Sequence, residues 1–236
     1  MSSDCRLVKF RLTRIFPVHH EEPAQIQMVV VTDRPVLGFA AALLALKLLS
    51  APKDDVPYRP EIGDVLFQPL PLLSDLVAAI EGITQSPYSH CGVVVQKNEE
   101  WHVIEAAARV TTTPLEEWID RGRHNQFAAF RLKPDYEQQI PQFIEALYAY
   151  QGRPYDIQYD LDDEAIYCSE LIYKGFRDAT GENLGQLVRL GDLDWKPYKD
   201  IITRYGGDPP PLDRIMITPK HLSEAEQLVK IFEHTK

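Results

Sequence analysis

Two side chains suited to acid–base chemistry fall on a predicted β-hairpin. Two apolar runs, residues 91–96 and 101–106, are separated by four polar residues, which is typical of an antiparallel hairpin. A symmetric turn then pairs Gly92 with Glu105. Because strand side chains alternate, His90 shares the face of Gly92, and Glu105 lies diagonal to it on that face, about 7 Å away between backbones. The carboxylate can therefore orient the imidazole.

Cys168 is the candidate nucleophile. It lies in the first turn of a predicted helix that begins at residues 167–173, directly after an acidic stretch at residues 160–164. The free N–H groups and the dipole of a helix N-terminus stabilise a thiolate, and His90 could complete an ion pair with it. The acidic stretch works in the other direction, since negative charge raises a thiol pKa.

Nucleophile, base and orienting carboxylate together are what acyl transfer requires. Spacing alone leaves two alternatives open, because a cysteine on a helix is often an inert core residue and a histidine on a strand is often structural.

The other potential metal ligands in the sequence do not form the pattern of a metal site. Cys91 alternates with His90, so it faces the opposite side of the sheet and is expected to be a small buried hydrophobe. His102 and the adjacent pair at residues 19–20 have no partner at ligand spacing. The acidic residues 160–164 lack the glycine and the ligand pattern of a calcium loop. We expect no metal and no cofactor.

The chain is predicted to contain an N-terminal extension, residues 1–55, and one catalytic domain, residues 56–236. The extension has two strand patterns, at residues 7–16 and 24–32, and an apolar helix at residues 36–49. That helix is about 21 Å long, which is short of the ~30 Å hydrocarbon core of a bilayer. It is expected to be buried against its own domain, or otherwise against a partner or a membrane surface.

The remaining patterns predict an α+β domain in which a small antiparallel sheet packs against helices. Strand patterns occur at residues 64–68 and 127–132, and helical patterns occur at residues 71–83, 136–151 and 219–233.

Composition limits the classes of ligand and the cellular locations that the sequence favours. The chain has 25 Lys and Arg against 35 Asp and Glu, a net charge of -10, which repels phosphate backbones and argues against nucleic acid as a ligand. Three cysteines without a CxxC pair argue against a disulfide framework. No apolar stretch stands where a secretory signal normally does. The expected location is the cytoplasm, or the envelope after export by another route.

Several motifs occur in a characteristic order: Gly63 to Phe67, Ser86 to Val95, Val103 to Ala106, Gly152 to Asp156 and Tyr167 to Ile172. Together they resemble the YiiX/YebB-like group of NlpC/P60 papain-like cysteine hydrolases in circularly permuted form. The order of histidine, then acidic residue, then cysteine marks the permutation. The likeness runs from about residue 61 to Leu222.

The resemblance implies a bacterial enzyme with a papain-like α+β fold, in which Cys168 is the nucleophile, His90 the base and Glu105 the group that orients it. Tyr155 is similar to a tyrosine near the family's active site, where it would bind substrate or stabilise an oxyanion. The implied substrates are amides of cell-wall peptides. Cys91, where an aliphatic residue is more usual, and the extension depart from the pattern.

Three alternatives remain at this stage. Permuted relatives also resemble lecithin retinol acyltransferase, which suggests a lipid acyl hydrolase or acyltransferase with residues 36–49 lining an acyl pocket. A second alternative is a non-catalytic binding module that keeps the papain-like shell and docks onto a partner through residues 36–49. A third is an antibacterial effector that is exported without a signal peptide.

Overall fold

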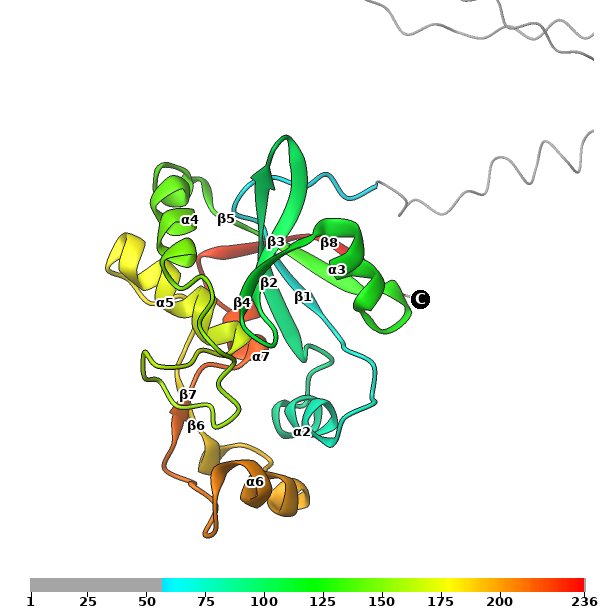
Figure 1. Cartoon of the computed structure of the whole chain (residues 1–236), viewed down its shortest axis with the longest axis vertical. Helices are drawn as coiled ribbons and strands as arrows, with labels where there is room; N and C mark the ends of the chain where they lie inside the picture. Colours follow the sequence, from blue (N-terminus) through cyan, green and yellow to red (C-terminus); the bar gives the residue numbers. More distant parts are fainter. Residues whose placement is uncertain (1–56, 236) are drawn as a thin grey trace, which may run out of the picture. The chain divides into compact units, whose positions relative to one another are not determined.

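A six-stranded antiparallel sheet forms the centre of the computed structural model, which describes residues 57–235 (Figure 1). The strand order is β4-β3-β2-β1-β5-β8. These strands are β1 (Val65–Gln68), β2 (His90–Lys97), β3 (Glu100–Ala106), β4 (Val110–Pro114), β5 (Phe127–Leu132) and β8 (Leu228–His234). A separate two-stranded sheet pairs β6 (Val188–Arg189) with β7 (Ile215–Met216). The predicted strands and apolar helix of the extension lie outside the described residues.

Helices cover both faces of the large sheet. The helices of the described residues are α2 (Asp75–Thr84), α3 (Leu115–Arg121), α4 (Ile140–Ala149), α5 (Cys168–Thr180), α6 (Lys199–Gly206) and α7 (Pro219–Ser223). Short 3-10 turns occupy Arg123–Asn125, Pro134–Gln139, Leu190–Asp192 and Lys196–Tyr198. Helices α4 and α5 lie together on one side of the strands, and α3 lies on the other (Figure 1). The predicted α+β class, with a sheet packed against helices, is confirmed.

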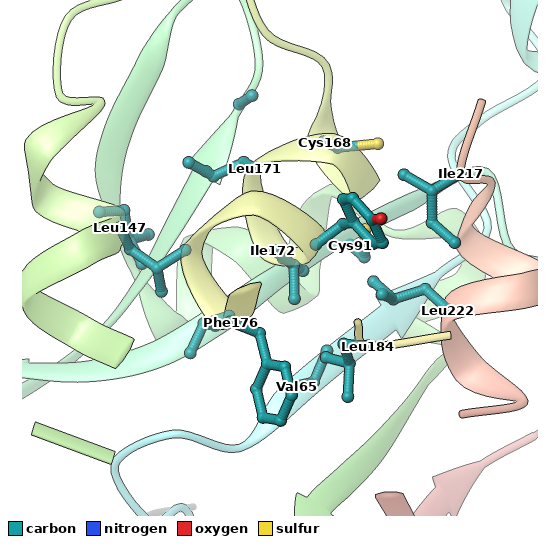
Figure 2. Close-up of a cluster of buried hydrophobic side chains, with 14 of the residues drawn as sticks. Val65, Cys91, Leu147, Cys168, Leu171, Ile172, Phe176, Leu184, Ile217 and Leu222 are labelled. Carbon is teal, nitrogen blue, oxygen red and sulfur yellow. The ribbon is translucent and has the colours of Figure 1, made fainter. Parts of the chain in front are cut away.

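Alternation along the strands builds two separate cores. On β2, Cys91 and Val93 belong to the larger core with α4 and α5, part of which is drawn in Figure 2. Val94 of the same strand belongs to the smaller core around Trp118 of α3. His90 lies on the side of the smaller core, because its ring centroid lies 6.1 Å from that of Trp118. The sheet therefore presents His90 on the α3 side and Cys91 on the α5 side.

The predicted hairpin register is confirmed. Val93 pairs with Ile104, and Val95 pairs with His102, as a symmetric turn requires. Gly92 directly precedes the paired residue Val93, and a Cβ atom at Gly92 would come within 2.4 Å of Val103 Cγ1 and 3.0 Å of the Ile104 carbonyl oxygen. The absence of a side chain at Gly92 is therefore what allows the hairpin to pack this closely beside Glu105.

The start of α5 is fixed by buried polar contacts. The Tyr167 N–H donates to Glu170 Oε2 at 3.1 Å, which satisfies one free donor of the helix N-terminus. The Ile217 N–H donates to the Tyr167 hydroxyl at 3.1 Å, and the Ser169 hydroxyl donates to the Ile217 carbonyl at 2.9 Å. These bonds attach the segment that carries Ile217 to the turn that carries Cys168.

Two sequence expectations need correction. Residues 219–233 are not one helix: α7 has five residues, and β8 then pairs with β5. Tertiary pairing prevails there because β8 satisfies the backbone groups at the edge of β5. The elements β4 and α3 were missed. Three consecutive threonines, which favour strands, mark β4, and helical spacing of Leu115, Trp118 and Ile119 marks α3.

Replacing Gly92 by Ala should lower the free energy of unfolding by about 1–3 kcal/mol, because the new methyl group overpacks a fully buried contact. Urea titration followed by circular dichroism measures this change. The matched test is Gly92→Ala combined with Val103→Ala, which removes the closest clash. The double variant should be more stable than the sum of the two single effects, and simple additivity would contradict the packing argument.

Candidate active site

His90 and Glu105 meet in the interior of the hairpin. His90 Nε2 lies 2.5 Å from Glu105 Oε2, and Glu105 is fully buried. With Glu105 ionised, Nε2–H donates to the carboxylate, so neutral His90 keeps Nδ1 as its free basic nitrogen. The predicted diagonal placement of these two residues therefore brings them into direct contact.

Glu105 is held by two further donors. The Thr113 hydroxyl donates to Oε1 at 2.6 Å, and Arg121 Nη2 donates to Oε2 at 2.5 Å. Burial acts to raise the pKa of Glu105, but the bonds and charges of His90 and Arg121 outweigh it and lower the pKa to about 2. Thr113 and Arg121 were missed in the sequence because they lie on β4 and at the end of α3, two elements that were not predicted.

Cys168 is the first residue of α5, and its thiol interacts with two consecutive residues of β2. A hydrogen bond from the Cys91 thiol is the main reason why the pKa of Cys168 is well below its ordinary value; burial opposes this, and His90 adds to it. Burial acts to lower the pKa of His90, but its bonds to Cys168 and Glu105 raise it to about 9. The two pKa shifts favour a thiolate on Cys168 and a protonated imidazole on His90.

Cys91 affects the pKa of Cys168, which the sequence did not reveal. It is fully buried in the α5-side core, as alternation predicts. Burial and then the charge and bond of Cys168 raise its pKa, so it stays a neutral thiol that can donate. Its position next to His90 in the chain was the available signal: a group that approaches the beginning of β2 can reach both residues.

Tyr155 is partly buried and belongs to a group of aromatic side chains beside the thiol. Its hydroxyl is 3.1 Å from that of Tyr159, and the Tyr159 ring centroid is 4.8 Å from that of Tyr167. Burial, then Tyr159 and the charge on Cys168, raise the pKa of Tyr155 well above its ordinary value. Tyr155 is therefore a neutral hydroxyl near Cys168, and Tyr159 was not singled out from the sequence.

The acidic stretch does not raise the pKa of Cys168 as expected. Asp160 Oδ1 lies 2.9 Å from Arg214 Nε, and Asp163 Oδ1 lies 2.9 Å from Lys174 Nζ. These cations offset the carboxylates, and the nearer contacts of Cys168 prevail.

The donor set does not suit a metal ion. Within residues 57–235, no three His, Cys, Asp or Glu side chains are grouped as ligands. The carboxylate of Glu105 is already engaged by His90, Thr113 and the cationic Arg121. Arg121 would repel a second cation at this carboxylate.

A low-pKa cysteine at a helix start, paired with a strand histidine and a carboxylate, defines the class of papain-like thiol hydrolases. Residues 59–232 match the model of the permuted papain-like amidase family YaeF/YiiX, C92. The chain belongs to this family and is a cysteine hydrolase of the peptidase/amidase type.

Two relatives from Escherichia coli are similar along most of their length. The uncharacterized protein YiiX of strain K12 is 30% identical over 194 residues, which cover 80% of this chain and 94% of that protein. A crystal structure described as metalloprotein yiiX from O157:H7 has a TM-score of 0.71 and 28% identity, and the match covers 76% of this chain and 100% of that one. Among the residues described here, no helix combines the length and apolarity needed to cross a membrane.

Replacing His90 by Ala should slow alkylation of Cys168 by iodoacetamide at neutral pH, because the thiolate loses its cationic partner. The rate as a function of pH, read by peptide mass spectrometry, should shift to higher pH. His102→Ala is the matched control on the same hairpin, since the His102 ring contacts the Glu100 carbonyl and not the thiol. Identical profiles for wild type and His90→Ala would refute the ion pair.

Replacing Cys91 by Val should also move the alkylation profile of Cys168 to higher pH, because the variant removes the donor that contributes most to its low pKa. Cys91→Ser retains a donor and should stay closer to wild type. If the Val and Ser variants behave alike, packing rather than the hydrogen bond is responsible.

Proposed function

We propose that the protein hydrolyses an amide or ester bond by covalent catalysis, with Cys168 as nucleophile, His90 as general base and acid, and Glu105 as the group that orients His90. The observation that supports this most directly is the buried contact of His90 Nε2 with Glu105, which directs the other ring nitrogen to chemistry at Cys168. A non-catalytic module would have no use for three buried titratable groups whose pKa values are tuned in this way.

The steps follow from the geometry. The thiolate attacks the substrate carbonyl, and free N–H groups at the start of α5 stabilise the oxyanion. His90 gives its proton to the leaving amine or alcohol as the bond to the carbonyl carbon breaks, which leaves a thioester on Cys168. His90 then takes a proton from water, and hydrolysis releases the acid. We assign Tyr155 a supporting role, in which its neutral hydroxyl donates to the substrate or the oxyanion.

Two substrate classes are candidates for this reaction. The family resemblance favours amides in cell-wall peptides, and an exported antibacterial effector would use the same chemistry. A specific feature favours the second class, amides or esters of aliphatic acyl groups: an apolar pocket that shares Tyr159 and Ile217 with the surroundings of Cys168.

Replacing Cys168 by Ala should reduce turnover of muropeptides or dispersed phospholipids, whichever the wild type cleaves, by more than about 10³-fold, because no acyl-enzyme can form. For the wild type, kcat/KM should fall as pH rises through about 9, where His90 loses the proton that the leaving group needs.

The low-pH limb of the kcat/KM profile should lie below the ordinary pKa range of a thiol, because the pKa of Cys168 is lowered. Mass spectrometry measures the released products, and a melting curve shows whether the Cys168→Ala variant is folded. Full activity of a folded Cys168→Ala protein would end the proposal.

A further inference from the structure

Two of the three cysteines in the sequence, Cys91 and Cys168, meet at the candidate active site. Both are free, both are buried, and both belong to the larger core. Figure 2 shows them in the same cluster, with the sulfur of Cys168 projecting from the first turn of α5. The Cys91 thiol is hydrogen-bonded to the sulfur of Cys168. A disulfide requires its two sulfurs to approach each other directly, and these two already do so without a covalent bond.

The two sulfurs differ in their readiness to be oxidised. Cys168 favours the thiolate, which is the form of a cysteine that reacts with peroxides. Cys91 stays a neutral thiol, because burial and the neighbouring charge of Cys168 raise its pKa. Oxidation therefore begins at Cys168. Its product, a sulfenic acid, forms in contact with a thiol, which is the arrangement that turns a sulfenic acid into a disulfide.

The charge on Cys168 also controls when Cys91 can react. A thiol attacks another sulfur in proportion to its thiolate fraction, so a raised pKa keeps Cys91 unreactive while Cys168 is a thiolate. A sulfenic acid on Cys168 is neutral, and the loss of the charge lowers the pKa of Cys91. Cys91 thus becomes the better nucleophile when its neighbour has been oxidised.

The surroundings of Cys91 restrict its choice of partner. Its exposed fraction is 0%, so thiols in solution have no access to it. It is held on β2, in the core that also contains α5, and its hydrogen-bond partner is the sulfur of Cys168. A disulfide formed by Cys91 in the folded protein is therefore expected to be the one with Cys168.

We propose that Cys91 and Cys168 are a site of reversible oxidation, at which a peroxide converts the two thiols into a disulfide and stops the hydrolysis. The effect on hydrolysis rests on the proposed function, since it requires Cys168 to be the nucleophile. The disulfide itself requires only the two sulfurs and the peroxide.

The reaction has two steps. First, the Cys168 thiolate forms a sulfur–oxygen bond with the peroxide while the oxygen–oxygen bond breaks, and for hydrogen peroxide the leaving hydroxide takes the proton of His90 and becomes water. Second, the sulfur of Cys91 forms a bond to the sulfur of Cys168 while the sulfur–oxygen bond breaks, and the hydroxyl group leaves with the proton of Cys91 as water. The peroxide is reduced to two waters, and the two sulfurs together lose two electrons. A dithiol such as dithiothreitol reverses the change and is itself oxidised.

Hydrogen peroxide added to the full chain tests the proposal. In wild type, peroxide should abolish the alkylation of Cys168 by iodoacetamide, and dithiothreitol should restore it. Peptide mass spectrometry without reductant should find the peptides of Cys91 and Cys168 joined, with the loss of two hydrogens. A map in which Cys168 carries two or three added oxygens while Cys91 remains a free thiol would overturn the proposal, and this result needs no variant.

Cys91→Ser separates the disulfide from the hydrogen bond. Serine keeps a donor beside Cys168 but has no sulfur, so peroxide should still oxidise Cys168. Without a partner thiol the oxidation should proceed to the sulfinic acid, which dithiothreitol does not reduce. Recovery of alkylation in a folded Cys91→Ser protein, checked by melting curve, would contradict the assignment of Cys91.

Cys5→Ser is the matched control, because Cys5 is the third cysteine of the chain and lies outside the described residues. This variant should lose and regain the alkylation of Cys168 as wild type does. A disulfide that joins Cys168 to Cys5, or that joins two chains, would overturn the proposal in favour of a different partner.

Hydrolysis of p-nitrophenyl acetate, measured on the same samples, separates this proposal from the proposed function. A disulfide of Cys91 with Cys168 in a protein whose hydrolysis does not depend on Cys168 supports the oxidation site and contradicts the proposed function. Hydrolysis that depends on Cys168, and that peroxide ends without forming this disulfide, supports the proposed function and contradicts the oxidation site.

Discussion

The buried carboxylate of Glu105 is the constraint on which the site depends. A charge with no exposure to water is stable only if donors replace its hydration, and Glu105 obtains them from His90, Thr113 and Arg121. Those donors come from three elements, β2, β4 and the end of α3, so satisfying one carboxylate ties the hairpin to its neighbouring strand and helix. The same contact orients the imidazole and holds its pKa high enough for an ion pair with a thiolate.

The position of Cys168 depends on packing against the face of the sheet opposite to His90. Helix α5 packs with the core that contains Cys91, and the hydroxyls of Tyr167 and Ser169 attach its start to the backbone of Ile217. This placement sets the thiol at the beginning of β2, where two consecutive strand residues that face opposite sides can both reach it. One residue is His90, the proposed base, and the other is Cys91, a neutral donor that lowers the thiol pKa further. The apolar pocket follows from the same attachment, because Ile217 belongs both to its wall and to the support of α5.

The sequence determined most of the pairing that forms the site. Its alternation and turn symmetry gave the hairpin register, and hence the contact of His90 with Glu105, because those patterns are local and have a fixed period of two. The start of α5 at Cys168 was likewise expected from a local helical pattern, and the family resemblance brought Cys168 to the same hairpin. The acidic stretch was misleading, since sequence shows its charge and not the cations Arg214 and Lys174 that offset it.

Tertiary structure decided what depends on long-range contacts. Thr113 and Arg121 reach Glu105 only because β4 and α3 fold over the hairpin, and residues 228–234 became a strand because the edge of β5 was available. The link from Cys91 to Cys168 and the pocket beside Tyr159 join residues far apart in the chain. Period and propensity describe each segment by itself, so the sequence determined the hairpin, the start of α5 and the reacting groups, while the partners that tune those groups were decided by which segments meet in space.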